Sequence, residues 1–311
     1  MENKIPPRNS WNEFIKWHAG RYHQNRAKGI VTYDSLEFPI RWDRSIPLHQ
    51  HLFYIFKYYI EEIQIFNNTD INIYRVKTIC NCVLNSYMLS VYGHMDQAVC
   101  ILGKQLDLRN YIEKIPQKTS LYRLRPDKEN LKAKNDFLHV PFDKIYLCNS
   151  MRFSMPGEPC LYLGYSKDVC YRELGKDSGG SLGHFVTKEE MQVVDLTLDA
   201  QKNGNTNMFE FWPILAACYV APDNRNANFK EEYIFPQVLM NFIKNKKKNN
   251  VIGLRYYSCR KADLDPSSKE YMNIALFTDT NKSGFISIDD DYPLLESPYD
   301  EDLARKLDFI Q

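Results

Sequence analysis

The sequence lacks both an excess of charge of either sign and any long apolar run. Its 311 residues include 40 Lys and Arg against 39 Asp and Glu, which leaves a net charge of +1 at pH 7. A nearly neutral chain has no global field to steer it, so neither nucleic acid nor a membrane is an expected partner. No apolar run approaches the roughly 20 residues that cross a bilayer. The first residues, MENKIPPRNSWNEF, contain no apolar signal segment, so we expect a cytoplasmic protein.

Several common nucleotide-binding and metalloprotease motifs are also missing. The chain contains no Walker A loop, no Rossmann GxGxxG and no HExxH. Their absence argues against a P-loop NTPase, a Rossmann dinucleotide-binding enzyme and a zinc metalloprotease of that type. The glycine-rich segment SGGSLG at residues 178–183 is not followed by the Lys-Ser/Thr signature of a phosphate-binding loop. We interpret this segment as a flexible loop near the functional site.

The eight cysteines show no arrangement typical of zinc sites. Cys80-Asn-Cys82 is a close pair without CxxC spacing, and His49-Gln-His51 is a second doublet. A zinc site that combines the two doublets is one interpretation. The favoured one is that Cys80 is a core thiol in an apolar helical stretch. In a cytosolic protein the thiols are expected to be reduced, and we predict no metal.

The first part of the chain has the spacing of helices. Hydrophobic residues make up 44% of the sequence and aromatic residues 14%, which is ample for a packed core. Helices are expected over residues 11–18, 48–66, 70–88 and 96–112, from the recurrence of apolar residues at helical spacing. Thr69 or Asp70 is a candidate cap of the third helix. Residues 1–115 are therefore predicted to form a mainly helical N-terminal domain.

After Pro116 the pattern changes to short strands. Strands are expected at residues 121–125, 144–148, 160–164, 184–186, 192–196, 251–257 and 273–278, from alternation or short apolar runs. Helices are expected at residues 166–174, 212–220 and 233–244, the first capped by Ser166 or Asp168. The tail from Asp289, which is rich in Asp and Glu, is expected to be exposed. Residues 116–311 are therefore predicted to form an α+β domain.

Three arginines and one acid between residues 121 and 175 are the candidates for chemistry. Arg123 and Arg125 alternate within LYRLR, where a plain core strand would not place arginines. Arg152 lies in SMRFSMPG, and an arginine held by aromatic neighbours in a cleft can bind a phosphate through two hydrogen bonds. The alternative for Arg152 is a surface arginine that lies over Phe153. Glu173 follows an apolar strand, and a carboxylate at such a position is commonly a solvated helix residue.

Two further residues gain interest only in combination. Tyr162 alternates with Leu161 and Leu163 and so faces away from them. Ser258 ends a strand, where a serine usually makes a local hydrogen bond. The lysines at 244–248 follow a predicted helix, where cations complement the helix dipole, so they do not indicate nucleic acid.

Taken together, these pieces resemble the RES domain family, which is named for an arginine, a glutamate and a serine. The resemblance covers about residues 118–280. Its parts, in chain order, are Tyr122-Arg-Leu-Arg125, Arg152-Phe-Ser-Met-Pro-Gly157, Leu161-Tyr-Leu163, Glu173 and Tyr256-Tyr-Ser258. Many members have Gly and Asn where this chain has Met151 and Ser154, and Val-Pro-Ser where it has Tyr-Tyr-Ser. These departures are those of a divergent, larger branch.

The resemblance implies an ADP-ribosyltransferase-like fold and an activity on NAD, with NAD as substrate and no cofactor. It implies that Glu173, Arg152 and Ser258 are catalytic. It also implies substrate-binding roles for Tyr162, Arg123, Arg125 and Ser154, and leaves open which arginine contacts the pyrophosphate. Short members of the family are toxins that deplete NAD by hydrolysis or phosphorolysis, or transfer ADP-ribose to a protein, and each is blocked by an antitoxin.

The expected function is therefore that of an NAD glycohydrolase or phosphorylase, acting as a toxin or antiphage defence effector. The first alternative is an ADP-ribosyltransferase that modifies a macromolecule. The second is an inactive interaction module that works through its helical region. Residues 1–115 would be either a scaffold or a regulatory domain that gates the cleft. The sequence leaves open whether the chain forms a homo-oligomer.

Overall fold

The computed structural model divides the chain into two compact units. It describes residues 11–27, 36, 38–42, 44–66, 71–126, 131–174, 179–197, 208–221, 229–245, 250–259, 271–279 and 297–310. The helical unit comprises Met1–Asp107 and Asn203–Phe242, and the sheet unit comprises Leu108–Lys202 and Ile243–Gln311. The predicted domains, 1–115 and 116–311, differ from these units in two respects. Residues 108–115 belong to the sheet unit, and residues 203–242 belong to the helical unit. The regulatory and catalytic roles assigned to the predicted domains stay predictions.

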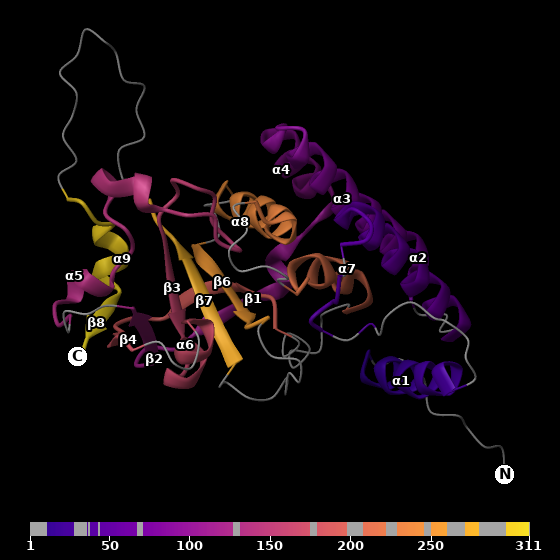
Figure 1. Cartoon of the computed structure of the whole chain (residues 1–311), viewed down its shortest axis with the longest axis horizontal. Helices are drawn as coiled ribbons and strands as arrows, with labels where there is room; N and C mark the ends of the chain where they lie inside the picture. Colours follow the sequence, from indigo (N-terminus) through magenta and orange to yellow (C-terminus); the bar gives the residue numbers. More distant parts are fainter. Residues whose placement is uncertain are drawn as a thin grey trace, which may run out of the picture. The chain divides into compact units, whose positions relative to one another are not determined.

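The helical unit contains the helices predicted from apolar spacing (Figure 1). They are α1 (Trp11–Ala27), α2 (Leu48–Phe66), α3 (Ile73–Val91), α4 (Met95–Gln105), α7 (Met208–Cys218) and the greater part of α8 (Ile234–Asn245). The cap of α3 is Asn72, whose side-chain oxygen accepts a hydrogen bond from the Arg75 N–H at 3.0 Å. The capping candidates Thr69 and Asp70 lie outside the described residues.

Helix α7 is almost completely buried. All but one of its residues are buried, so it has no solvent-facing stripe, as expected of a core helix. It packs against α2 and α3. The Tyr59 ring stacks on Trp212 with centroids 4.1 Å apart, and the Tyr59 hydroxyl donates to the Phe209 carbonyl at 2.9 Å.

The sheet unit is built on one mixed sheet of eight strands (Figure 1). Their order is β1-β5-β6-β7-β3-β2-β4-β8, and among these strands only β5 and β6 are parallel neighbours. The strands are β1 (Ile112–Ile115), β2 (Ser120–Arg125), β3 (Cys160–Gly164), β4 (Ser181–Thr187), β5 (Met191–Asp195), β6 (Val251–Tyr257), β7 (Met272–Phe277) and β8 (Leu307–Phe309). The short α-helices are α5 (Lys134–Phe137), α6 (Lys167–Leu174) and α9 (Glu301–Arg305). The predicted mixture of helices and strands is confirmed.

Three local predictions were wrong. Residues 144–148 are not a strand, because Phe142–Leu147 form a 3-10 helix that begins after Pro141. The helix predicted over residues 96–112 ends at Gln105, and residues 112–115 form β1, an edge strand paired with β5. The described end of the chain is not simply exposed, because Leu303 and Leu307 are buried in the core.

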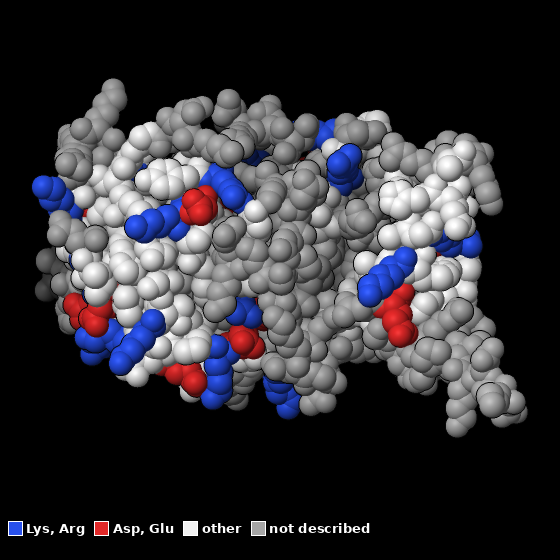
Figure 2. Space-filling model, turned by 90° about the horizontal axis from the view of Figure 1, so that it is seen from below, with Lys and Arg blue, Asp and Glu red and all other residues white. Residues whose placement is uncertain are grey.

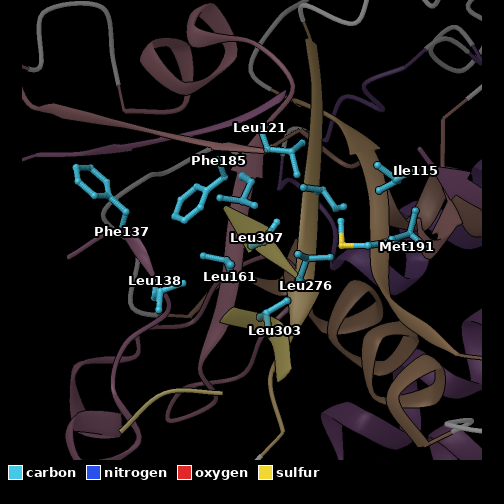
Figure 3. Close-up of a cluster of buried hydrophobic side chains, with 13 residues drawn as sticks. Ile115, Leu121, Phe137, Leu138, Leu161, Phe185, Met191, Leu276, Leu303 and Leu307 are labelled. Atoms are coloured by element: carbon cyan, nitrogen blue, oxygen red, sulfur yellow. The ribbon is translucent and has the colours of Figure 1, made fainter. Parts of the chain in front are cut away.

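One face of the sheet carries the main apolar core (Figure 3). The core residues are Ile115, Leu121, Phe137, Leu138, Leu161, Leu163, Phe185, Met191, Val193, Ile274, Leu276, Leu303 and Leu307. Since successive strand residues face opposite ways, the residues between these positions point to the other face. There, Val169 and Cys170 of α6 pack against Leu124 of β2.

Gly164 allows α6 to lie close to β3. A Cβ atom at this position would be 2.4 Å from Val169 Cγ1 and 2.8 Å from Cys170 Sγ, far inside normal contact distances. A residue with any side chain would therefore push the helix away from the strand. Helix α6 begins as predicted, since the Ser166 hydroxyl accepts a hydrogen bond from the Val169 N–H at 3.1 Å.

The described surface mixes charges of both signs. On the face shown in Figure 2, lysine and arginine side chains lie beside aspartate and glutamate side chains. Among the described residues, no helix is long and apolar enough to cross a bilayer.

Candidate active site

A row of four residues runs across the sheet on the face covered by α6. Tyr256 of β6 pairs with Asn273 of β7, Asn273 pairs with Gly164 of β3, and Gly164 pairs with Tyr122 of β2. Residues in register on neighbouring strands share a face, so all four face the same way. Tyr162 lies two residues before Gly164 and joins them on this face. The strands thus bring together residues up to 151 positions apart in the chain.

The turn that carries Arg152 is attached to this face by Tyr162. An antiparallel bridge between Met151 and Ser154 closes the turn. The Tyr162 hydroxyl oxygen accepts a hydrogen bond from the Phe153 N–H at 3.2 Å and lies 3.1 Å from the Ser154 hydroxyl. The turn is therefore anchored at two successive residues, and Ser154 supports its geometry.

An aromatic contact fixes the other side of the same turn. The Phe153 ring meets the Tyr256 ring edge-on, with centroids 4.7 Å apart. Such edge-to-face pairs contribute about 0.5–1.5 kcal/mol beyond the area that they bury. Arg152 lies inside the turn closed by the Met151–Ser154 bridge, directly before the anchored Phe153, and is only 8% exposed. Arg152 is thus buried rather than spread over the surface.

Glu173 reaches the same face from α6. It lies in the last turn of that helix and is half-buried. Its Oε1 accepts a hydrogen bond from the Asn273 side-chain amide at 3.0 Å. Asn273 is itself only 5% exposed. The carboxylate is therefore tied to the centre of the four-residue row.

Both charged candidates act electrostatically on Tyr256. Burial and the negative charge of Glu173 raise the pKa of the Tyr256 hydroxyl well above its ordinary value, and the positive charge of Arg152 opposes that shift. Burial also raises the pKa of Tyr162 well above its ordinary value. Both phenols are therefore neutral at physiological pH and can donate hydrogen bonds.

Ser258 lies next to this group. It follows β6 directly, and its N–H donates to the Tyr271 carbonyl at 2.8 Å, which continues the ladder between β6 and β7. Strand alternation places it on the face of Tyr256, two residues earlier. The residue is 2% exposed. The sheet thus brings Arg152, Ser154, Tyr162, Glu173 and Ser258 into one neighbourhood.

Arg123 and Arg125 make their hydrogen bonds outside this group, although Tyr162 is among the groups that act electrostatically on Arg123. Both alternate with Tyr122 and so share the opposite face of β2 with Leu121. Arg123 donates to the carbonyls of Phe137 and Leu138 at 3.1 and 2.8 Å, and Arg125 donates to that of Leu138 at 2.9 Å. Burial, with Arg125 nearby, lowers the pKa of Arg123 to about 9, which still leaves it charged at neutral pH. Both arginines therefore hold the backbone of residues 137–138 against β2.

The glycine-rich segment does not form a hydrolase nucleophile elbow. Residues 179–183 read GGSLG and match the GxSxG spacing, but Ser181 is the first residue of strand β4. A nucleophile elbow requires a sharp turn from a strand into a helix. Residues 175–178 lie outside the described part of the chain. Within that part, no group of three or more His, Cys, Asp and Glu residues is placed to hold a metal ion.

Sequence reasoning missed Asn273 and Tyr256. Tyr256 precedes Ser258 by two residues, and this spacing could have identified it as a neighbour on the same face. Asn273 is the single polar residue in the strand MNIALF. A polar residue in an otherwise apolar, central strand indicates a buried partner, and that signal was present in the sequence.

Comparison with known proteins points to toxins. No model of a known protein family matches the chain, and no solved structure matches it. A protein of Bacillus subtilis (strain 168) described as "Putative toxin YopC" is 26% identical over 219 residues. The aligned region covers 62% of this chain and 49% of that relative. The chain therefore spans about half the length of the curated relative and is similar to a toxin-like protein.

Proposed function

We propose that this chain is a RES-type toxin that cleaves the bond between nicotinamide and ribose in NAD. The observation that carries the proposal is the convergence of Arg152, Tyr162 and Glu173 on one face of the sheet. These residues match the family's parts in chain order, and the similarity to a toxin-named protein is an independent indication. A mixed sheet with a carboxylate supplied by α6 is consistent with the ADP-ribosyltransferase-like fold that we propose for the sheet unit.

The chemistry requires a negative charge beside the ribose. The bond from ribose C1′ to the nicotinamide nitrogen breaks with its electron pair passing to nicotinamide, which leaves positive charge on the ribose as in glycoside hydrolysis. Glu173 would accept a hydrogen bond from a ribose hydroxyl and stabilise this charge. Water or phosphate then bonds to C1′ and gives up a proton. No redox change takes place.

Arg152 would hold the pyrophosphate. Its turn is fixed by Tyr162 and by the Phe153–Tyr256 contact, so the guanidinium needs little ordering when an anion binds. A planar guanidinium can donate two parallel hydrogen bonds to phosphate oxygens. Tyr162 would act by holding this turn, and Ser258 would hydrogen-bond the nucleotide or help to position Glu173.

A protein partner follows from the same proposal. An enzyme that consumes NAD would damage its own host unless it is restrained. We therefore include an antitoxin among the proposed partners, and co-expression screens for proteins that relieve toxicity would identify it.

The test compares wild type with Glu173→Gln, which keeps the size of the side chain and removes its charge. We expect NAD consumption by purified protein to fall about 100- to 1,000-fold, as on losing one stabilising group of a transition state, and cellular NAD to stay normal. Glu61→Gln makes the same change at an exposed position of α2 and should leave the rate unchanged. A Glu173→Gln protein with wild-type turnover would refute the assignment.

The fate of the ADP-ribose identifies the acceptor. NAD labelled in its ribose should yield free ADP-ribose with water as acceptor and ADP-ribose-1-phosphate with phosphate. Label retained on protein or nucleic acid would instead identify an ADP-ribosyltransferase. Whichever of the three products the wild type forms, Glu173→Gln should form almost none of it.

A further inference from the structure

We propose that Asn273 is a positioning residue for Glu173, fixing the carboxylate in the orientation that the reaction needs. This role rests on the proposed function, since it concerns the same site. Asn273 lies outside the arginine, glutamate and serine pattern of the sequence. It contacts Glu173 across 100 residues of chain, from β7 to α6.

The first argument is the position of Asn273 within its strand. β7 lies inside the sheet between β6 and β3, and its other residues are Met272, Ile274, Ala275, Leu276 and Phe277. A buried amide costs free energy unless its hydrogen bonds are satisfied. If packing were the only requirement at this central strand position, an apolar residue would meet it. The Asn273 amide instead donates to a carboxylate, which is the stronger, charge-assisted kind of hydrogen bond.

The second argument is the space around this amide. Its register partners are Tyr256 on one side and Gly164 on the other. Since Gly164 has no side chain, α6 approaches the sheet at this point, and a Cβ there would overlap Val169 and Cys170. The same close approach brings the last turn of α6, with Glu173, within 3.0 Å of the amide.

The third argument is that the helix itself does not stabilise Glu173. The C-terminal end of a helix carries partial negative charge, so a carboxylate in the last turn is unfavourably placed. Glu173 lies in the last turn of α6, one residue before its end at Leu174. A donor from β7 offsets this disadvantage and limits the rotation of the side chain. The hydrogen bond thus holds the side chain at a position that helix electrostatics alone would disfavour.

The test separates catalysis from stability with three variants. Asn273→Ala removes the donor, Asn273→Asp replaces it with a second carboxylate, and Glu173→Gln with Asn273→Asp exchanges the two groups. Asn72→Asp makes the same Asn-to-Asp change at the cap of α3, where either side chain accepts the N–H, and serves as control. Each protein is assayed for kcat and KM with NAD and for its melting temperature.

We expect Asn273→Ala to lower kcat about 10- to 100-fold, as on losing a hydrogen bond to a charged group, with KM nearly unchanged. Asn273→Asp should lower kcat further and reduce the melting temperature, because two carboxylates then face each other. The exchanged double variant should recover melting temperature relative to Asn273→Asp but remain inactive. Asn72→Asp should match wild type in all three quantities.

The outcomes distinguish this role from the proposed function. Wild-type protein that leaves NAD intact would refute the proposed function and this role with it. Active wild type together with wild-type kcat in Asn273→Ala would remove only the role of Asn273. If Asn273→Ala does not fold, the double variant Glu173→Gln with Asn273→Asp provides the test. If its melting temperature is no higher than that of Asn273→Asp, the inference is overturned.

Discussion

At the scale of single residues, three arginines that look alike in the sequence occupy two different environments. Arg123 and Arg125 donate to backbone carbonyls of residues 137–138, on the face of β2 that carries Leu121. Arg152 lies in a turn that is anchored to Tyr162 on the other face. Of the three, we therefore propose Arg152 for the pyrophosphate contact.

Arginine substitutions test this distinction. Arg152→Ala should raise KM for NAD at least about tenfold, since it removes a bidentate anion contact, and should change the melting temperature little. Arg123→Ala should leave KM unchanged but destabilise the protein by about 1–3 kcal/mol. The Phe137 carbonyl loses its donor, and the Leu138 carbonyl keeps only the donor from Arg125. Chemical denaturation and steady-state kinetics measure both effects. A raised KM in Arg123→Ala alone would reverse the assignment.

At the scale of elements, the joint between α6 and β3 depends on Gly164. The sequence indicates the strand, the helix and the Ser166 cap, because each depends on local periodicity or capping chemistry. The sequence shows Gly164 at the end of the strand, but it does not show that α6 packs against the strand at that glycine. Close approach is a tertiary property, and it becomes visible only where Val169 and Cys170 meet the strand.

Gly164→Ala tests the joint. The added methyl group should force α6 away from β3, costing about 1–3 kcal/mol of stability, as overpacking does. It should also lower kcat by displacing Glu173 from Asn273. Gly179→Ala adds the same methyl group where no atom lies within 4 Å and is the control. Equal stability of the two variants in urea would show that the helix accommodates the methyl group.

The elements that sequence reasoning missed share a physical cause. Long helices such as α2 and α3 carry enough apolar repeats to identify themselves. Short strands such as β1 and β8 do not, because their conformation depends on the neighbouring strand that they pair with. The candidate site shows the same division. Glu173 and Arg152 lie in recognisable segments, but the Asn273 contact joins two segments 100 residues apart.

At the scale of the whole molecule, the end of the chain is fastened to its middle through a histidine. His139 Nδ1 lies 2.7 Å from the Val140 carbonyl, and Nε2 accepts a hydrogen bond from the Asp300 N–H at 2.9 Å. Asp300 in turn caps α9 by accepting the Leu303 N–H at 3.0 Å. The acceptor role of Nε2 requires the neutral ring.

This contact predicts a loss of stability in acid. Burial lowers the pKa of His139 below its ordinary 6.5, although the charge of Asp300 opposes the shift and those of Arg123 and Arg125 reinforce it. The unfolded chain therefore binds more protons than the native protein below about pH 6.5, so stability decreases as pH falls from there. His184 shifts in the same direction. Urea titrations between pH 7.5 and 5 should show a shallower pH dependence in His139→Gln; identical slopes would contradict the assignment.

The helical unit is assembled from two separate stretches of chain, before residue 107 and after residue 203. A single recombination event between related genes, with its crossover anywhere from residue 108 to residue 202, would therefore join α2 and α3 of one parent to α7 of another. Trp212 of one parent would then stack on Tyr59 of the other, although the surroundings of the two residues evolved in different proteins. In natural recombinants, both stretches are thus expected to come from the same parent gene. Chimaeras between relatives will need two crossovers to keep this core intact.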